Sequence, residues 1–208
     1  RLARNVHDFV FLSRADEDVR REIATTVQRA IQQAPLLHDM IHIDVEALDE
    51  LDRRLLVERH LISRQHAEGT GARRVAFDPQ EVAGIMINEE DHLRIQVMRS
   101  GLQISEAWQQ ISAIDDALEE HLEYEFHPQY GFLTACPTNV GTGLRCVGLD
   151  HPPEGQTLGL VLLGSGDVVS SQIGFDDARV AHRRLRVGDK HATPDLGQRE
   201  SRMGRGKP

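Results

Sequence analysis

The spacing of hydrophobic residues in the first third of the chain predicts two helices. Apolar residues recur at helical spacing over 15–34, and Pro35, which cannot continue a helix, follows them. A second apolar series from Leu48 to Leu56 comes after Asp44, a residue type that caps helix starts. We therefore expect one helix over 15–34, a second helix capped by Asp44, and then a loop that contains Gly69 and Gly71.

The middle of the chain predicts short strands. Apolar runs over 74–77 and 85–88 are typical of buried strands. Over 92–98 apolar and polar residues alternate, which is the period of a half-buried strand. Its predicted inner side comprises Leu93, Ile95 and Val97, and its predicted polar side comprises His92, Arg94 and Gln96.

A long helix is predicted after a turn at Ser100-Gly101, with Ser105 as its cap and residue 123 near its end. Its predicted buried face comprises Trp108, Ile111, Ile114, Leu118 and Leu122, and its predicted solvent face comprises Asp115, Asp116, Glu119 and Glu120. Further short strands are expected at 132–135 and 158–163. From Asp176 onward the periodicity fades and charge, Gly and Pro dominate, which indicates a disordered or poorly packed tail.

Composition places the chain among ordinary globular proteins. It has 208 residues, 39% hydrophobic and 27% charged, enough for about one domain with a real core. No apolar run reaches the ~18–20 residues of a membrane span, and no leader sequence opens the chain, so we expect a cytoplasmic protein without a membrane partner. Cys136 and Cys146 are too few for a disulfide framework and lack zinc-site spacing. The chain begins with Arg1 rather than Met, so we expect a fragment.

The net charge of −9 hides an uneven distribution. Residues 179–208 hold nine Lys and Arg against three Asp and Glu, a net charge of +6, which leaves −15 for the rest. A body this acidic repels nucleic acid, and the basic tail has neither aromatic residues nor a binding motif, so we expect no nucleic-acid partner. Lysine occurs only at Lys190 and Lys207, so the acidic body uses arginine, whose planar donors suit phosphate and carboxylate.

One candidate for chemistry is the acidic segment 88–94, N-E-E-D-H-L-R. The three consecutive acids, Glu89, Glu90 and Asp91, either form a solvated turn or stand at the mouth of a sheet between two strands. In the second case they can grip a guanidinium or an amine, and one of them can act as a general base. Arg94, on the polar side of the following strand, can face phosphate.

Two further segments carry weaker signals. The loop 136–145 combines small residues with glycines, which permit close approach to a ligand, and it ends at Arg145. Cys136 in this loop is either a small buried hydrophobic residue or a functional thiolate. The third segment is E-R-H at 58–60, where His60 is either an ordinary surface histidine or a ring that lies against a purine.

Together and in this order, the three segments resemble the ATP:guanidino phosphotransferase family, which includes creatine kinase, arginine kinase and bacterial protein arginine kinase. The resemblance covers residues 1–145 and rests on R-L-A-R-N-V at 1–6, E-R-H-L-I-S at 58–63, N-E-E-D-H-L-R at 88–94 and C-P-T-N-V-G-T-G-L-R at 136–145. Residues of 101–126 are more similar to the bacterial protein arginine kinase than to the enzymes of small guanidines.

The resemblance implies an α/β fold, the guanidino kinase catalytic domain, in which helices flank a curved antiparallel sheet. It implies a partial catalytic domain over 1–145, followed by a divergent or out-of-frame segment over 146–208. The implied activity is transfer of the γ-phosphoryl group of ATP, with Mg²⁺, to a guanidino nitrogen, foremost of arginine in proteins. The sequence carries no feature that indicates an oligomeric state.

The resemblance also implies residue roles. Arg1, Arg94 and Arg145 would bind the ATP phosphates, and His60 would lie at the nucleotide base and ribose. Glu90 would hold the guanidinium and help to take its proton, with Glu89 beside it. Cys136 would lie against the guanidinium as a thiolate that orients it without forming a covalent bond.

The chain departs from the family pattern at both ends. The first part of the N-terminal phosphate segment and the later R-G-x-x-G-E segment are absent, and Cys146 opens a stretch that differs from the family's A-S-V. A single-base frame shift at Arg145 would restore that continuation; a genuinely divergent C-terminus is the rival hypothesis. In either case we expect an incomplete ATP site, marginal folding and little turnover in isolation. An inactive guanidinium-binding remnant and a small-guanidine phosphagen kinase are the alternative functions.

Overall fold

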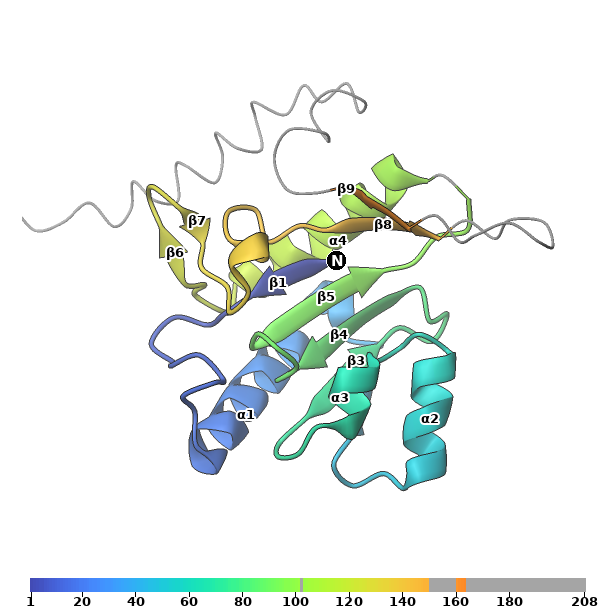
Figure 1. Ribbon diagram of the computed structural model, residues 1–208, viewed down its shortest axis with the longest axis horizontal. Helices are drawn as coiled ribbons and strands as arrows, with labels where there is room; N and C mark the ends of the chain where they lie inside the picture. The colour runs from blue at the N-terminus through green and yellow to red at the C-terminus, as the bar shows by residue number, and fades with distance from the viewer. Residues whose placement is uncertain (102, 150–159, 164–208) are drawn as a thin grey trace, which may run out of the picture. The chain divides into compact units, whose positions relative to one another are not determined.

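Five strands form one antiparallel sheet in the computed structural model of this protein, which describes residues 1–101, 103–149 and 160–163 (Figure 1). Their order is β1-β5-β4-β3-β2. The strands are β1 (Leu2–Arg4), β2 (Ile41–Asp44), β3 (Arg74–Phe77), β4 (Ala83–Ile87) and β5 (Leu93–Val97). The first strand of the chain therefore lies beside the fifth, with Ala3 opposite Arg94.

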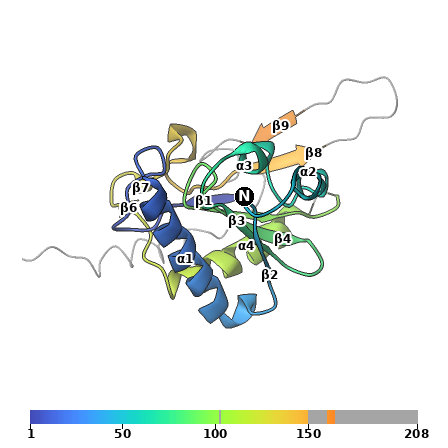
Figure 2. The ribbon, with the colours of Figure 1, turned by 90° about the horizontal axis from the view of Figure 1, so that it is seen from below.

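Helices cover both faces of the sheet, because successive strand residues point to opposite sides. On one face, α1 (Glu17–Gln33) and α4 (Ile104–Glu119) pack in a core that includes Ile85 and Ile95. On the other face, α2 (Glu50–Glu58) and the short α3 (Arg64–Glu68) flank a smaller core that includes Met86 (Figure 2). The predicted α/β architecture, an antiparallel sheet flanked by helices, is confirmed.

Smaller elements complete the described part of the chain. They are the 3₁₀ turns η1 (Pro35–Leu37) and η2 (Pro137–Asn139), the hairpin of β6 (Phe126–His127) and β7 (Gly131–Phe132), and the antiparallel pair β8 (Cys146–Leu149) and β9 (Leu160–Leu163). Single bridges join Leu144 to Leu2 and Gly141 to Phe132. The loop after η2 therefore lies between β1 and the hairpin.

Several predicted elements are confirmed with small shifts. Asp16 caps α1 through a 2.9 Å bond from the Val19 N–H, and the helix ends before Pro35. The strand predicted over 74–77 is β3, and the alternating segment is β5. Of the strand predicted over 158–163, residues 160–163 form β9. The tail predicted from Asp176 onward lies outside the described residues.

Four local predictions are wrong. The strand predicted over 132–135 does not form, because β7 ends at Phe132. Asp44 belongs to β2 and caps no helix; the cap of α2 is Asp49, whose carboxylate accepts the Asp52 N–H at 2.9 Å. Ser105 is not a cap either, because α4 begins at Ile104, and the helix ends at Glu119. Asp115, predicted on the solvent face of α4, is only 1% exposed. None of the helices in the described ranges is both long and apolar enough to span a membrane.

Candidate functional site

A small pocket, open to solvent, lies where β1 and β5 meet the acidic turn and the loop after η2. It is lined by Arg1, Leu2, Ala3, Glu89, Glu90, Asp91, Arg94, Asn139 and Gly143. Four of the residues singled out from the sequence, Arg1, Glu89, Glu90 and Arg94, therefore share one pocket. Carboxylates and guanidinium groups face the same small space, which suits a ligand that carries both signs of charge.

The acidic turn is anchored through Asn88, which adopts the left-handed backbone conformation with φ of 62°. Its buried Nδ2 donates to the carbonyl oxygens of Arg20 in α1, at 2.8 Å, and Ala72, at 2.7 Å. An asparagine tolerates this backbone conformation better than most residues. The turn that carries the acids is thus fixed to the helix beneath it.

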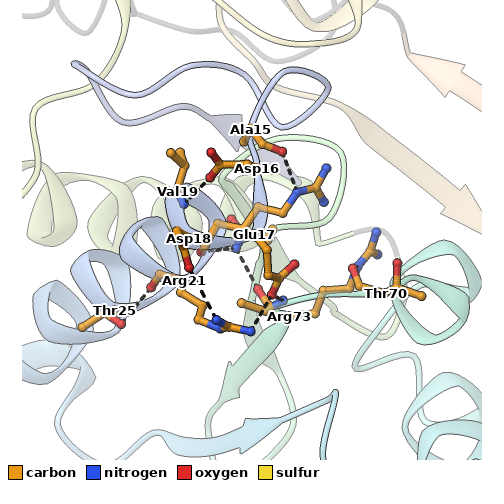
Figure 3. Close-up of polar contacts among 12 residues, drawn as sticks. Ala15, Asp16, Glu17, Asp18, Val19, Arg21, Thr25, Thr70 and Arg73 are labelled. Atoms are coloured by element: carbon orange, nitrogen blue, oxygen red, sulfur yellow. Dashed lines mark hydrogen bonds and ion pairs between the residues drawn. The ribbon is translucent and has the colours of Figure 1, made fainter.

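The first turn of α1 is in turn fixed to the glycine loop that precedes β3 (Figure 3). Glu17 accepts the N–H of Ala72 at 3.2 Å, and a side chain at Gly71 would come within 2.6 Å of the Glu17 carboxylate. In the same loop the Arg73 guanidinium donates to the Thr70 carbonyl at 3.3 Å. These contacts hold Ala72 at the place where its carbonyl oxygen accepts the hydrogen bond from Asn88 Nδ2.

Glu89 is committed to two neighbours. Its Oε1 accepts from Arg94 Nη1 at 2.6 Å and from Ser63 Oγ at 2.7 Å, and its side chain is 4% exposed. Ser63 also caps α3, because its Oγ accepts the His66 N–H at 3.0 Å. Glu89 therefore orients Arg94 and ties it to α3.

Glu90 is the exposed carboxylate of the turn and lines the pocket. Desolvation raises its pKa above the usual range, and the negative charges of Asp91 and Glu89 raise it further, whereas Arg1 and Arg94 act in the opposite direction. A carboxylate with a raised pKa is a better proton acceptor than an ordinary surface glutamate. The two glutamates therefore differ in their surroundings: Glu89 is buried against Arg94 and Ser63, whereas Glu90 is exposed in the pocket.

Arginines from three parts of the chain lie close enough for their charges to act on one another, and two of them, Arg1 and Arg94, line the pocket. Burial lowers the pKa of Arg1, and so do the positive charges of Arg94 and Arg145. The backbone of Arg145 is fixed beside β1, because its N–H donates to the Arg1 carbonyl at 2.8 Å. Such clustered cations repel one another and are stabilised by an anion such as phosphate.

Cys136 opens η2 and is linked to Arg145 through one hydroxyl. Thr138 Oγ1 lies 2.9 Å from Cys136 Sγ and accepts from Arg145 Nη2 at 2.7 Å. Since the arginine supplies a donor to this oxygen, the threonine proton is available to the sulfur. Cys136 and Arg145 are thus joined to each other through Thr138, but neither lines the pocket; Asn139, the residue after Thr138, does.

His60 does not line the pocket. It lies two residues after the end of α2, in the left-handed conformation with φ of 58°, and its side chain is exposed. Its carbonyl accepts from Gln96 Nε2 at 2.7 Å, and Gln96 lies two residues after Arg94, on the same side of β5. His60 is therefore near the arginine side of the site, and its contact with a nucleotide stays a prediction.

Sequence reasoning assigned no role to Arg4 and Asn5 and treated Asp91 only as one of three acids; the structure places all three around this site. Asp91 lines the pocket, Asn5 binds Asp91 at 2.7 Å, and Arg4 is fully buried. All three belong to segments already singled out, R-L-A-R-N and N-E-E-D, so their inclusion in those motifs was the available signal. Their partners, however, lie 86 or more residues away along the chain.

Metal ligation by the protein alone finds no support. No group of three or more His, Cys, Asp or Glu residues within 1–101, 103–149 and 160–163 has the geometry to hold a metal ion.

Comparison with known proteins identifies the family. The family model for "ATP:guanido phosphotransferase, C-terminal catalytic domain" matches residues 22–153. The chain is 45% identical over 156 residues to a protein-arginine kinase of Symbiobacterium thermophilum, and 44% identical over 153 residues to one of Halothermothrix orenii. In both cases the match covers 74% of this chain and 44% of the relative, so the chain spans less than half the length of these relatives.

Solved structures show the same fold. A substrate-free duplicated taurocyamine kinase from Schistosoma mansoni superposes with a TM-score of 0.64 at 25% identity, over 69% of this chain and 22% of that one. A lombricine kinase superposes with a TM-score of 0.63 at 22% identity, over 69% of this chain and 44% of the other.

Proposed function

Because this chain belongs to the ATP:guanido phosphotransferase family, we propose that it forms part of the catalytic site of a kinase that transfers the γ-phosphoryl group of ATP to arginine in proteins. The observation that carries the proposal is the pocket that Glu90 shares with Arg1 and Arg94, whose positive charges act on its carboxylate. We infer the class of acceptor from the relatives, which are named protein-arginine kinases and which the chain matches over 44% of their length.

The division of charge in the pocket fits the two substrates. Glu90 receives the guanidinium of the acceptor arginine, and Arg1, Arg94 and Arg145 neutralise the ATP phosphates. In the transfer a guanidino nitrogen bonds to the γ-phosphorus while the bond to the bridging oxygen breaks, and ADP leaves with that electron pair. The proton of the attacking nitrogen passes to Glu90, whose raised pKa favours its acceptance.

Cys136 and His60 complete the proposed site. Cys136, as a thiolate that accepts a hydrogen bond from the Thr138 hydroxyl, lies against the guanidinium and orients it by charge. His60, exposed at the end of α2, stacks on the nucleotide base. Neither residue forms a covalent bond to substrate.

Magnesium enters this proposal as part of the nucleotide. Mg²⁺ keeps several waters and binds substrate phosphates rather than an all-protein cage, and the described residues offer no three-ligand cluster. The chemistry that the ion supplies is neutralisation of charge on the phosphate oxygens.

The direct test is a phosphotransfer assay with the 208-residue chain, ATP, Mg²⁺ and an arginine-rich protein acceptor, with phosphoarginine detected by mass spectrometry. We expect phosphoarginine in the acceptor and its loss in Glu90→Gln. Glu81→Gln is the matched control, because Glu81 pairs with Arg59 at 2.7 Å and does not line the pocket. Phosphorylation that survives Glu90→Gln contradicts the assignment.

A second candidate function is guanidinium binding without catalysis. It is favoured by the 2.6 Å contact of Arg94 with Glu89, which engages a guanidinium that the kinase needs for phosphate. Calorimetric titration separates the two. Binding of an arginine peptide without binding of Mg²⁺-ATP supports the remnant, whereas binding of both supports the kinase.

A further inference from the structure

Asp91 connects the acidic turn to the loop that carries the cysteine. Its Oδ1 accepts the backbone N–H of Ala135 at 2.6 Å and Nδ2 of Asn5 at 2.7 Å. Asp91 follows Glu90 directly, and Ala135 directly precedes Cys136. One carboxylate oxygen therefore links the neighbour of the proposed base to the neighbour of the proposed thiolate.

We propose that Asp91 is a positioning residue that holds Cys136 at a fixed place relative to Glu90. The inference rests on the proposed function, because that function gives the arrangement its purpose. The arrangement itself can be tested without measuring turnover. Asp91 acts here through its hydrogen-bond acceptor and not as a base or a ligand of the nucleotide.

The surroundings of Asp91 favour a fixed link over a mobile one. The residue is 3% exposed, and a hydrogen bond to a buried carboxylate is stronger than one between neutral groups. Burial raises the pKa of Asp91, whereas the bonds from Ala135 and Asn5 lower it. These two donors thus offset part of the cost of keeping the carboxylate charged inside the protein.

Asn5 fixes both ends of the link. Besides Asp91, its Nδ2 donates to the Leu133 carbonyl at 3.1 Å, and its Oδ1 accepts the His92 N–H at 2.9 Å. The acidic turn and the start of the cysteine loop are therefore bound to the same side chain of the segment after β1.

Little freedom is left between Ala135 and the sulfur. Thr134 Oγ1 donates to the Cys136 carbonyl at 2.8 Å, and the same carbonyl accepts the Asn139 N–H at 2.9 Å as η2 begins. A displacement of Ala135 therefore moves Cys136 with it, because the backbone of residues 134–139 is held as one short unit.

Two substitutions distinguish a positioning role from a role of the charge. Asp91→Asn keeps an oxygen that can accept from Ala135 and Asn5 but removes the charge, whereas Asp91→Ala removes both. Asp78→Ala is the matched control, since the Asp78 carboxylate also accepts two backbone N–H groups, from Val82 and Ala83 at 2.9 Å each, in a turn that does not line the pocket.

The measurement is the rate at which iodoacetamide alkylates Cys136, in the 208-residue chain with Cys146→Ser, followed by mass spectrometry. In Asp91→Ala we expect the rate to rise about threefold or more, because release of the loop exposes a half-buried sulfur. In Asp91→Asn and Asp78→Ala we expect the parent rate. Hydrogen exchange at the Ala135 amide of the parent, expected to be slow, gives an answer even where Asp91→Ala does not fold.

Three results overturn the proposal: an unchanged or lower rate in folded Asp91→Ala, a rise in Asp91→Asn as large as in Asp91→Ala, or an Ala135 amide that exchanges as fast as an exposed loop amide. All three are read without ATP or acceptor. A parent chain that makes no phosphoarginine but shows the expected alkylation rates would refute the proposed function and leave the role of Asp91 intact.

Discussion

Arg4 and Asp115 form a two-pronged ion pair inside the protein, with Nε and Nη2 at 3.0 and 2.7 Å from the two carboxylate oxygens. Both side chains are at most 1% exposed. Arg4 also lies 3.8 Å from the centre of the Phe132 ring and donates through Nη1 to the Thr142 carbonyl at 2.8 Å. The pair therefore joins β1 and α4 to the loop after η2.

Loss of one partner of this pair should be costly. Asp115→Ala leaves a buried guanidinium without its counter-charge, which we expect to lower the free energy of unfolding by about 3–5 kcal/mol. Urea denaturation followed by circular dichroism measures the change. The neighbouring Asp116 is exposed, and Asp116→Ala should change stability by about 0.5 kcal/mol or less. Equal losses in the two variants would contradict a structural role for the pair.

Gly143 should resist substitution more than another glycine of similar backbone conformation. Its φ is 68°, and an added Cβ would lie 2.5 Å from both the Ala3 carbonyl oxygen and Arg4 Nη1. Gly101 has φ of 73° but open space around it. We expect Gly101→Ala to cost about 1 kcal/mol for backbone strain and Gly143→Ala about 1–3 kcal/mol more for the clash. Comparable thermal unfolding of the two variants would show that the loop after η2 can move away from β1.

Stability should fall as the solution becomes acidic, because burial lowers the pKa of His92 and of His66 from 6.5 to about 4. Between these values the unfolded chain binds protons that the folded chain does not. For each histidine we expect a loss of about 2 kcal/mol between pH 7 and pH 5. The raised pKa values of Glu90 and Asp91 act in the opposite direction and offset part of this loss.

The measurement for this pH dependence is urea unfolding at several pH values, with His92→Gln as the test variant. The His92 ring accepts from the Val6 N–H and faces the Val10 carbonyl, both at 3.0 Å, and an amide can serve both partners without titrating. The variant should show a flatter dependence on pH. A slope equal to that of the parent would mean that His92 is not the titrating group.

The two glutamates of the pocket should differ in kinetics. Glu90→Gln removes the proposed proton acceptor, and we expect kcat for phosphotransfer to fall about 100-fold or more. Glu89→Gln weakens the contact that orients Arg94, so we expect mainly a higher KM for ATP. Initial-rate kinetics at varied ATP and acceptor give both constants. A fall in kcat in Glu89→Gln together with a higher KM in Glu90→Gln would contradict these assignments.

The hypothesis of a frame shift at Arg145 predicts a specific coding sequence. A single-base change of frame after this codon should open A-S-V followed by a hydrophobic strand. The family match extends to residue 153, and β8 begins at Cys146, so the segment in question adjoins the described fold. Sequencing of the coding DNA decides the matter, and a frame without that continuation leaves a divergent C-terminus.

Local patterns predicted the parts of the fold whose causes are local. The helix α1 was predictable from its apolar spacing and from Pro35, and β5 from its alternation. The cap of α2 was not, because Asp44 and Asp49 both precede most of the leucines and only the pairing of β2 with β3 excludes the first. Sequence spacing alone does not distinguish the end of a strand from the start of a helix.

The site, like the fold, was predictable only where its causes are local. The motifs predicted that Glu89, Glu90, Arg1 and Arg94 belong together, and they do line one pocket. Their different contacts were not predictable, since the partner of Glu89 on α3 is set by tertiary packing. Asp115 was predicted on the solvent face of α4 because a carboxylate on a helix is normally solvated. Its partner, Arg4, lies 111 residues earlier, so no local pattern indicated the buried ion pair.

The position of β1 also bears on synthesis of the protein on the ribosome. Arg4 is made first, but its acceptor on Thr142 is made 138 residues later. During translation the sheet from β2 to β5 can assemble while the first segment waits in solution, its guanidinium still hydrated. The pocket can therefore be completed only after Asn139 and Gly143 are made, later than every strand of the five-stranded sheet, and a chain released before them could fold in part but would lack this pocket.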